Sequence, residues 1–129
     1  MTMHAALNDQ SLIYQQIARM LEDGILRGIY PEGSQVPSTN ELARHFNINP
    51  ATAGKGINLL VAEGMLYKRR GLGMFVSEGA AALVREKRRQ AFYTTYIRPL
   101  VKEARSLALS EAELAGMIRR AMEEGAEEV

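Results

Sequence analysis

Hydrophobic positions recur at helical spacing in the first part of the chain. Between Ser11 and Gly28 an apolar side chain returns at every fourth residue, at Ile13, Ile17, Leu21 and Ile25. This period lines one face of a helix, and Ser11 and Gly28 are residue types that favour its start and its end. The pattern predicts an amphipathic helix over residues 11–28. A turn at residues 31–33 and a very short strand at residues 34–36 follow.

Two more helices are predicted close together. Ser38 and Glu41 have the spacing of a capping box, in which each side chain accepts a hydrogen bond from the backbone amide of the other residue. This helix ends near Asn47 and is predicted to bury Leu42, Ala43 and Phe46. Asn49-Pro50 suits the cap and first turn of a further helix over residues 50–63. Because only residues 46–49 separate them, the two helices have helix-turn-helix spacing.

The helix over residues 50–63 has an apolar side and a polar side. We expect an inward face of Ala53, Ile57, Leu60 and Val61, and an outward face of Ala51, Thr52, Gly54, Lys55, Gly56 and Asn58. A glycine inside a helix costs roughly 1 kcal/mol relative to alanine. Either a close approach to DNA or to a neighbouring backbone offsets this cost, or the surrounding fold tolerates it. The sequence leaves both explanations open.

After Gly64 the helical pattern gives way to two short strands, predicted at residues 65–69 and 73–77. The stretch YKRRGLGMFV at residues 67–76 has three consecutive cations and a Gly-x-Gly. A phosphate-binding loop needs its glycines between a strand and a helix start, whereas Gly71 and Gly73 lie between two strands. A hairpin without function is the simpler alternative. Against it, the three cations have no acidic neighbour before Glu78, which favours contact with a polyanion.

Helical periodicity returns from residue 80 to the end. Pro99 is predicted to kink or restart the helix near residues 97–98, and Ser110 with Glu113 forms a second capping box. The larger apolar residues gather on helix faces at Leu83, Phe92, Tyr96, Leu100, Leu114 and Ile118. Since the preceding domain has its own core, these faces need a partner. We expect an identical chain related by a two-fold axis, that is, a homodimer.

Composition and charge narrow the class of protein. The chain has 129 residues and no cysteine, which excludes disulfides and suits a cytoplasmic protein. We expect no membrane span, because the chain has no apolar run of sufficient length, and no signal peptide, because its first ten residues lack a charged region followed by an apolar one. Residues 44–75 hold five bases and one acid, whereas residues 110–129 hold two bases and six acids. This asymmetry indicates a polyanion contact in the middle of the chain. A further basic cluster, Arg85, Lys87, Arg88 and Arg89, either contacts flanking DNA or is solvated.

Several motifs together resemble the DNA-binding domain of the GntR family of bacterial transcriptional regulators. They are Pro37-Ser38, Leu42-Ala43, Thr52, Leu60 and Glu63-Gly64, together with Gly71, Gly73, Phe75 and Val76. The last four lie in the predicted hairpin, which corresponds to the wing of that domain. Asn49-Pro50-x-Thr52 and the short helical C-terminal part are similar to the YtrA subfamily. The resemblance implies a mainly α fold with a small β wing. Its winged helix-turn-helix covers residues 11–78, and a helical dimerisation region follows at residues 79–129.

The candidate DNA-binding residues lie at the start of the second helix, on the third helix and in the wing. Amides and hydroxyls at a helix start bind phosphate. On the third helix, Thr52 and Asn58 suit phosphate or base edges and Lys55 suits phosphate or guanine; the resemblance also implies a role for Lys55. The full set is Ser38, Thr39, Asn40, Asn49, Ala51, Thr52, Lys55, Asn58, Lys68, Arg69, Arg70, Gly71 and Gly73.

The expected function is a sequence-specific DNA-binding transcriptional regulator, a homodimeric repressor of an inverted-repeat operator. It binds through residues 50–63 and the wing at residues 65–77. We expect no cofactor, no metal and no catalytic residue, and the sequence does not identify a small-molecule effector. The alternative is a winged-helix module that binds protein, against which the basic wing and the polar third helix argue. An enzyme is disfavoured because the chain has no cysteine and no convincing Ser/His/Asp arrangement or carboxylate pair.

Overall fold

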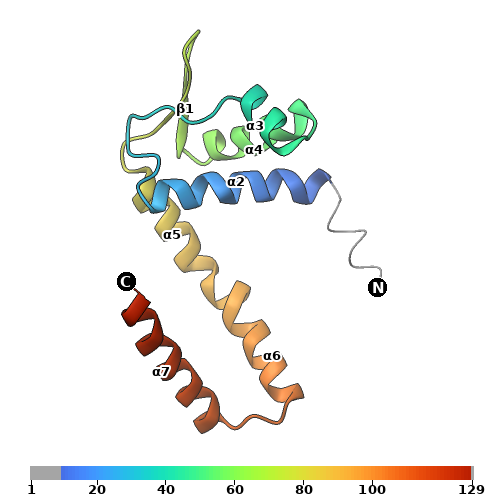
Figure 1. The fold of residues 1–129 in the computed structure, drawn as a ribbon, viewed down its shortest axis with the longest axis vertical. Helices are drawn as coiled ribbons and strands as arrows, with labels where there is room; N and C mark the ends of the chain where they lie inside the picture. Colours follow the sequence, from blue (N-terminus) through green and yellow to red (C-terminus); the bar gives the residue numbers. More distant parts are fainter. Residues whose placement is uncertain (1–9, 129) are drawn as a thin grey trace. The chain divides into compact units, whose positions relative to one another are not determined.

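A computed structural model describes residues 10–128 of the chain, and describes side chains for residues 12–126. The chain divides into two compact units, one ending at Lys87 and the other beginning at Arg88. The first contains α2 (Gln10–Leu26), α3 (Thr39–Phe46), α4 (Pro50–Ala62), β1 (Leu66–Arg69), β2 (Gly73–Val76) and the start of α5 (Ala80–Phe92). The second contains the end of α5, the π-helical turn η1 (Tyr93–Ile97), α6 (Arg98–Ser106) and α7 (Glu111–Glu128). Figure 1 shows these elements.

The first unit is a winged helix-turn-helix, which confirms the predicted fold class. α4 packs against both α2 and α3, and the β1–β2 hairpin projects from the helices as the wing (Figure 1). Strands β1 and β2 are antiparallel and pair Leu66 with Val76 at the base and Arg69 with Gly73 near the tip. The predicted short strand at residues 34–36 is present as a single bridge between Gln35 and Phe75.

Most of the predicted helix starts are confirmed. Ser38 and Glu41 form the capping box of α3, and Asn49 caps α4 by accepting a hydrogen bond from the Ala51 amide at 2.8 Å. The predicted start of α2 is wrong. Ser11 was expected to cap the helix, but the helix already includes Gln10, so Ser11 lies inside its first turn. The side chain of Ser11 lies outside the described part of the chain.

The core of the first unit extends beyond the elements predicted to build it. Leu21, Ile57 and Leu60 are fully buried, as expected, and so are Ala80 and Val84 of α5. One core prediction is wrong. Phe46 is 39% exposed, because it is the last residue of α3 and lies beside a solvent-open pocket, with its ring edge-to-face against His45.

Gly56 and Thr52 correct the predicted faces of α4. Both were expected on the outward face, and both are buried. A Cβ built on Gly56 would lie 2.8 Å from the Tyr14 carbonyl oxygen and 3.1 Å from Ile17 Cβ. The glycine therefore permits α4 to approach the backbone of α2, which decides between the two explanations left open by the sequence. A Cβ on Gly54 would make an ordinary contact of 3.6 Å with Thr39 Cγ2.

The second unit also follows its local signals. The helix restarts at Arg98 with Pro99 in its first turn, as predicted, and the π-helical turn η1 precedes the restart. Ser110 and Glu113 form the second predicted capping box, with bonds of 2.9 and 3.1 Å. Among the described residues of this unit, Ala104 alone is buried. None of the helices that the structure describes combines the length and the apolarity needed to cross a bilayer.

Candidate nucleic-acid interface

The start of α3 carries three of the candidate residues. The Ser38 hydroxyl accepts a hydrogen bond from the Glu41 amide at 3.1 Å, and the Ser38 amide donates to Glu41 Oε1 at 2.8 Å. The Ser38 amide, and then its hydroxyl, lower the pKa of the Glu41 carboxyl below its ordinary value. Thr39 is half-buried and Asn40 is exposed. The amide and the hydroxyl oxygen of Ser38 thus both take part in the cap, and the side chain of Asn40 is exposed to solvent.

Three candidate residues of α4 form one exposed stripe. Ala51, Lys55 and Asn58 are exposed and stand at i, i+4 and i+7, which places them on the same side of a helix. The other side of α4 is fixed in the core by Ala53, Ile57 and Leu60. The buried Thr52 does not belong to the stripe, so its candidate role in contacting bases loses its structural support. We define the recognition stripe as Ala51, Lys55 and Asn58.

Lys55 lies against an aromatic ring of the neighbouring helix. Its Nζ is 4.4 Å from the centroid of the Tyr14 ring, within the range of a cation–π contact. Such a contact at an exposed site contributes about 0.5–1 kcal/mol. It restricts the lysine while leaving it exposed. Tyr14 was not identified from the sequence, where it falls beside the apolar positions of the first helix and carries no motif.

The cations of the wing point in different directions. Neighbouring residues of a strand alternate between the two faces of a hairpin. Arg69 lies on the face of Phe75, with its guanidinium carbon 5.0 Å from the ring centroid, and Tyr67 is on the same face. Lys68 pairs with Met74 on the opposite face. Arg70 is in the exposed turn. The wing therefore presents positive charge on both faces and at its tip.

Two glycines shape the turn of the wing. The Leu72 amide donates to the Arg69 carbonyl at 2.9 Å, closing the turn. Gly71 and Gly73 have φ values of 76° and 121°, in the region that side chains rarely adopt. Their candidate role is therefore explained by backbone geometry. The side-chain amide of Gln35 also reaches this turn, where its Nε2 donates to the Leu72 carbonyl at 2.6 Å. Gln35 was missed from the sequence, whose only signal for it was the predicted strand at residues 34–36.

One residue of the predicted basic cluster has a specific partner pair. Lys87 Nζ lies 2.6 Å from Glu22 Oε2 and 2.9 Å from Glu63 Oε1, which joins α5 to α2 and to the end of α4. Burial by itself would lower the pKa of Lys87, but the hydrogen bonds to Glu22 and Glu63 outweigh it and raise the pKa above its ordinary value. Lys87 thus forms ion pairs that connect helices within the first unit. Neither of the two predicted roles, contact with flanking DNA or simple solvation, describes it.

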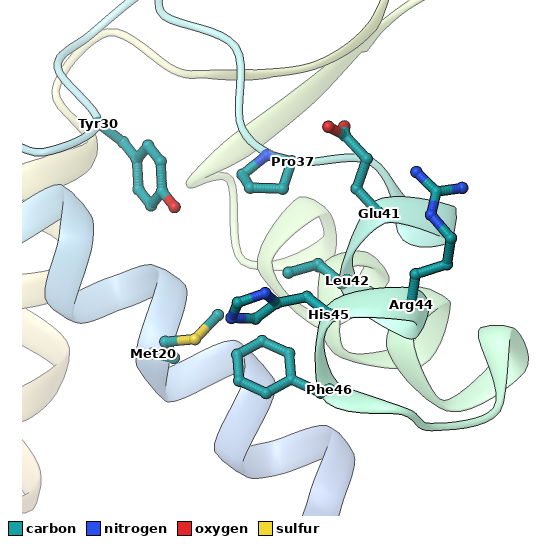
Figure 2. Close-up of a pocket in the computed structure, with 8 residues that line it drawn as sticks. All are labelled: Met20, Tyr30, Pro37, Glu41, Leu42, Arg44, His45 and Phe46. Atoms are coloured by element: carbon teal, nitrogen blue, oxygen red, sulfur yellow. The ribbon is translucent and has the colours of Figure 1, made fainter.

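A solvent-open pocket of about 570 Å³ lies beside α2 and α3 (Figure 2). It is lined by Met20, Tyr30, Pro37, Glu41, Leu42, Arg44, His45 and Phe46. None of the thirteen candidate DNA-binding residues is among them. Nor do three or more His, Cys, Asp or Glu side chains gather to suit a metal ion within the part of the chain that the structure describes.

The family model for bacterial regulatory proteins of the gntR family matches residues 13–76. The chain belongs to the GntR family. The matched segment contains α3, α4 and the wing, and with them every candidate DNA-binding residue. The family is one of DNA-binding transcriptional regulators and not of enzymes.

Curated relatives support the assignment at two different lengths. The "Probable fructoselysine utilization operon transcriptional repressor" of Escherichia coli is 40% identical over 65 residues, which are 50% of this chain and 27% of the relative. The chain thus spans about a quarter of that protein's length. The transcriptional repressor YtrA of Bacillus subtilis is 29% identical over 117 residues, which are 91% of this chain and 83% of YtrA. The similarity to YtrA therefore includes the second unit.

A solved structure is similar over most of the chain. A GntR-family transcriptional regulator from Bacteroides thetaiotaomicron is 29% identical, with a TM-score of 0.69. The match covers 88% of this chain and 98% of the other. Both the winged unit and the helices that follow it therefore have counterparts in this relative.

Proposed function

We propose that the protein is a homodimeric transcriptional repressor that binds an inverted-repeat operator through the recognition stripe and the wing. The observation that carries the proposal is the geometry of α4. One side is fixed in the core, and the other presents Ala51, Lys55 and Asn58 next in the chain to a basic hairpin. A helix in the major groove reads base edges through a few such side chains. YtrA, which is named a repressor, supports the direction of regulation.

Phosphate contacts come from the wing and the start of α3. Lys68, Arg69 and Arg70 are exposed cations, and Asn40 is an exposed amide at a helix start. Contacts of this kind set affinity and register and carry little sequence information. The division of labour follows from the side chains: Lys55 and Asn58 discriminate between bases, and the wing supplies binding strength that depends on salt.

Assembly as a dimer rests on the second unit. Phe92, Tyr93 and Ile118 are 53%, 63% and 43% exposed in the single chain. Several large apolar side chains exposed on one small unit indicate an interaction surface. Association of two identical chains about a two-fold axis is the commonest way to bury such a surface. Two recognition stripes would then enter successive major grooves about 34–36 Å apart. An inverted repeat is the operator that matches such symmetry.

Selection of DNA from a random duplex pool by the purified protein tests the proposal. We expect an enriched inverted repeat whose half-site centres are separated by about one helical turn. Enrichment of a single half-site would support DNA binding and contradict the proposed dimer. A pool without any enriched sequence would contradict the proposal and favour a winged-helix module that binds protein.

A further inference from the structure

Gln35 makes a side-chain contact with the tip of the wing. It lies in the segment before α3, and its Nε2 donates to the Leu72 carbonyl at 2.6 Å, across 37 residues of sequence. Leu72 is in the turn between β1 and β2, next to the exposed Arg70 and Gly71. A side chain outside the hairpin therefore reaches the turn that carries the cations.

Gly73 provides a second observation of the same contact. A Cβ built on Gly73 would lie 2.5 Å from Gln35 Nε2, closer than real Cβ atoms approach any atom. A side chain here would displace the Gln35 amide, apart from the strain that its φ of 121° imposes. The glycine thus leaves room for Gln35 as well as permitting the turn.

Backbone pairing fixes the base of the wing beside the same residue. The Val36 amide donates to the Met74 carbonyl at 3.0 Å, and the Val76 amide donates to the Ser34 carbonyl at 2.9 Å. These bonds flank the bridge between Gln35 and Phe75. Isolated two-stranded hairpins are only marginally stable in water. The side chain of Gln35 extends the support from the base of β2 to the turn.

We propose that Gln35 is a positioning residue for DNA binding: it clamps the wing turn so that Arg69 and Arg70 are held in place to meet the duplex. The inference rests on the proposed function, because it assigns Gln35 a purpose only if the wing contacts DNA. Gln35 acts through the wing and needs no contact with DNA itself. A preorganised loop binds more tightly because less conformational freedom is lost on binding.

The first test measures the wing without DNA. Gln35→Met keeps the length of the side chain and removes the donor, and Gln16→Met makes the same change at an exposed position of α2. Backbone ¹⁵N relaxation of residues 70–73 reports the order of the turn on the picosecond to nanosecond timescale. We expect lower order in Gln35→Met and wild-type order in Gln16→Met. An unchanged turn in Gln35→Met overturns the clamp.

The second test links the clamp to binding through a double-mutant cycle. Gln35→Met is expected to weaken binding to the selected operator by about two- to tenfold, the range for one hydrogen bond of modest net strength. In a chain that already carries Arg69→Ala and Arg70→Ala, it is expected to have no further effect. An equal loss in both backgrounds overturns the inference, because Gln35 then acts independently of the wing cations.

The two tests separate the inference from the proposed function. If the wild-type protein binds the operator and Gln35→Met binds equally well, the inference fails and the proposed function stands. If the wild-type protein binds no DNA, the proposed function fails, and with it the purpose assigned to Gln35. The relaxation measurement then decides by itself whether Gln35 holds the turn.

Discussion

The two compact units of the chain treat their apolar side chains in opposite ways. In the unit that ends at Lys87, helices, hairpin and the start of α5 share one core in which Leu21, Leu60 and Val84 are completely buried. In the described part of the unit that begins at Arg88, Ala104 is the one buried residue, while Phe92 and Ile118 are exposed. The first unit buries its larger apolar side chains within the single chain, whereas the described part of the second unit leaves such side chains exposed.

This difference separates two tasks of a regulator. A unit with its own core can hold side chains rigidly, which is what the proposed DNA recognition by the stripe on α4 requires. A unit with exposed apolar faces is suited to association, since burial of apolar surface is the main driving force for joining protein surfaces.

Truncating one isoleucine in each unit gives the sharpest contrast. Ile57→Ala removes a side chain that is 1% exposed, and we expect a loss of about 2–5 kcal/mol in the free energy of unfolding. Ile118→Ala changes a side chain that is 43% exposed and is expected to weaken self-association instead. Chemical denaturation and sedimentation of both variants provide the measurement. A large loss of stability in dilute, monomeric Ile118→Ala would contradict the comparison.

The two glycines of α4 form a matched pair within the first unit. Gly56→Ala places a methyl group against the Tyr14 carbonyl, and overpacking of this kind destabilises by about 1–3 kcal/mol. Gly54→Ala has room beside Thr39, so its higher helix propensity should stabilise the fold by up to about 1 kcal/mol. Thermal unfolding of the two variants is the test. Equal shifts in Tm would show that α4 does not approach α2 as closely as described.

The fold of this chain was predictable where its signals are local. The capping boxes at Ser38 and Ser110 and the restart at Pro99 each depend on residues a few positions apart, and each was identified from the sequence. Thr52 and Gly56 were assigned to the wrong face because polarity was used as the guide. Small residues tolerate burial, and Gly56 is buried because α4 packs closely against α2.

Functional details that depend on distant residues were not predictable from pattern. Lys87 and Glu22 are 65 residues apart, and Gln35 and Leu72 are 37 residues apart. No periodicity connects such pairs, since tertiary packing alone brings them together. For the same reason the sequence predicts only DNA contact or solvation for Lys87, whereas its partners are two carboxylates of its own unit.

Paired arginines distinguish DNA contact from general charge. Arg69→Ala with Arg70→Ala should lower the magnitude of the slope of log affinity against log salt by roughly 1.8, if both bind phosphate. Both side chains are exposed, and Arg69 makes a cation–π contact with Phe75, so stability should change by at most about 1 kcal/mol. Arg119→Ala with Arg120→Ala removes two exposed neighbouring charges from the second unit and should leave the slope unchanged. Equal slopes for the two double variants would show the wing to be idle.

Lys87 gives a prediction that depends on pH. Its pKa is raised in the folded chain, so its stabilisation is complete below the unfolded value near 10.5 and is lost as pH rises through the higher folded value. The lysine side chain is 40% exposed but its partner Glu22 is only 4% exposed, so Lys87→Met takes an ion-pair partner from a buried carboxylate and should cost about 1–3 kcal/mol at neutral pH. Thermal unfolding from pH 7 to 11 should show the difference from wild type shrinking only at the alkaline end. Arg85→Met, on the same helix, is the control.

The division into two units also decides where the chain can be cut. Ala80 and Val84 are completely buried in the core of the first unit, so a cut before residue 80 would remove part of that core. A cut after Lys87 keeps both residues and the ion pairs of Lys87. A fragment ending at Lys87 should therefore fold as a monomer and bind a half-site weakly, because linking two sites raises affinity without any new contact.

Sedimentation of the intact chain and of the fragment ending at Lys87, each with and without the selected operator, decides whether the second unit forms a dimer. We expect a dimer for the intact chain at micromolar concentration, two chains on one inverted repeat, and a monomeric fragment. An intact chain that remains monomeric and binds an asymmetric site one to one would contradict the proposed dimer.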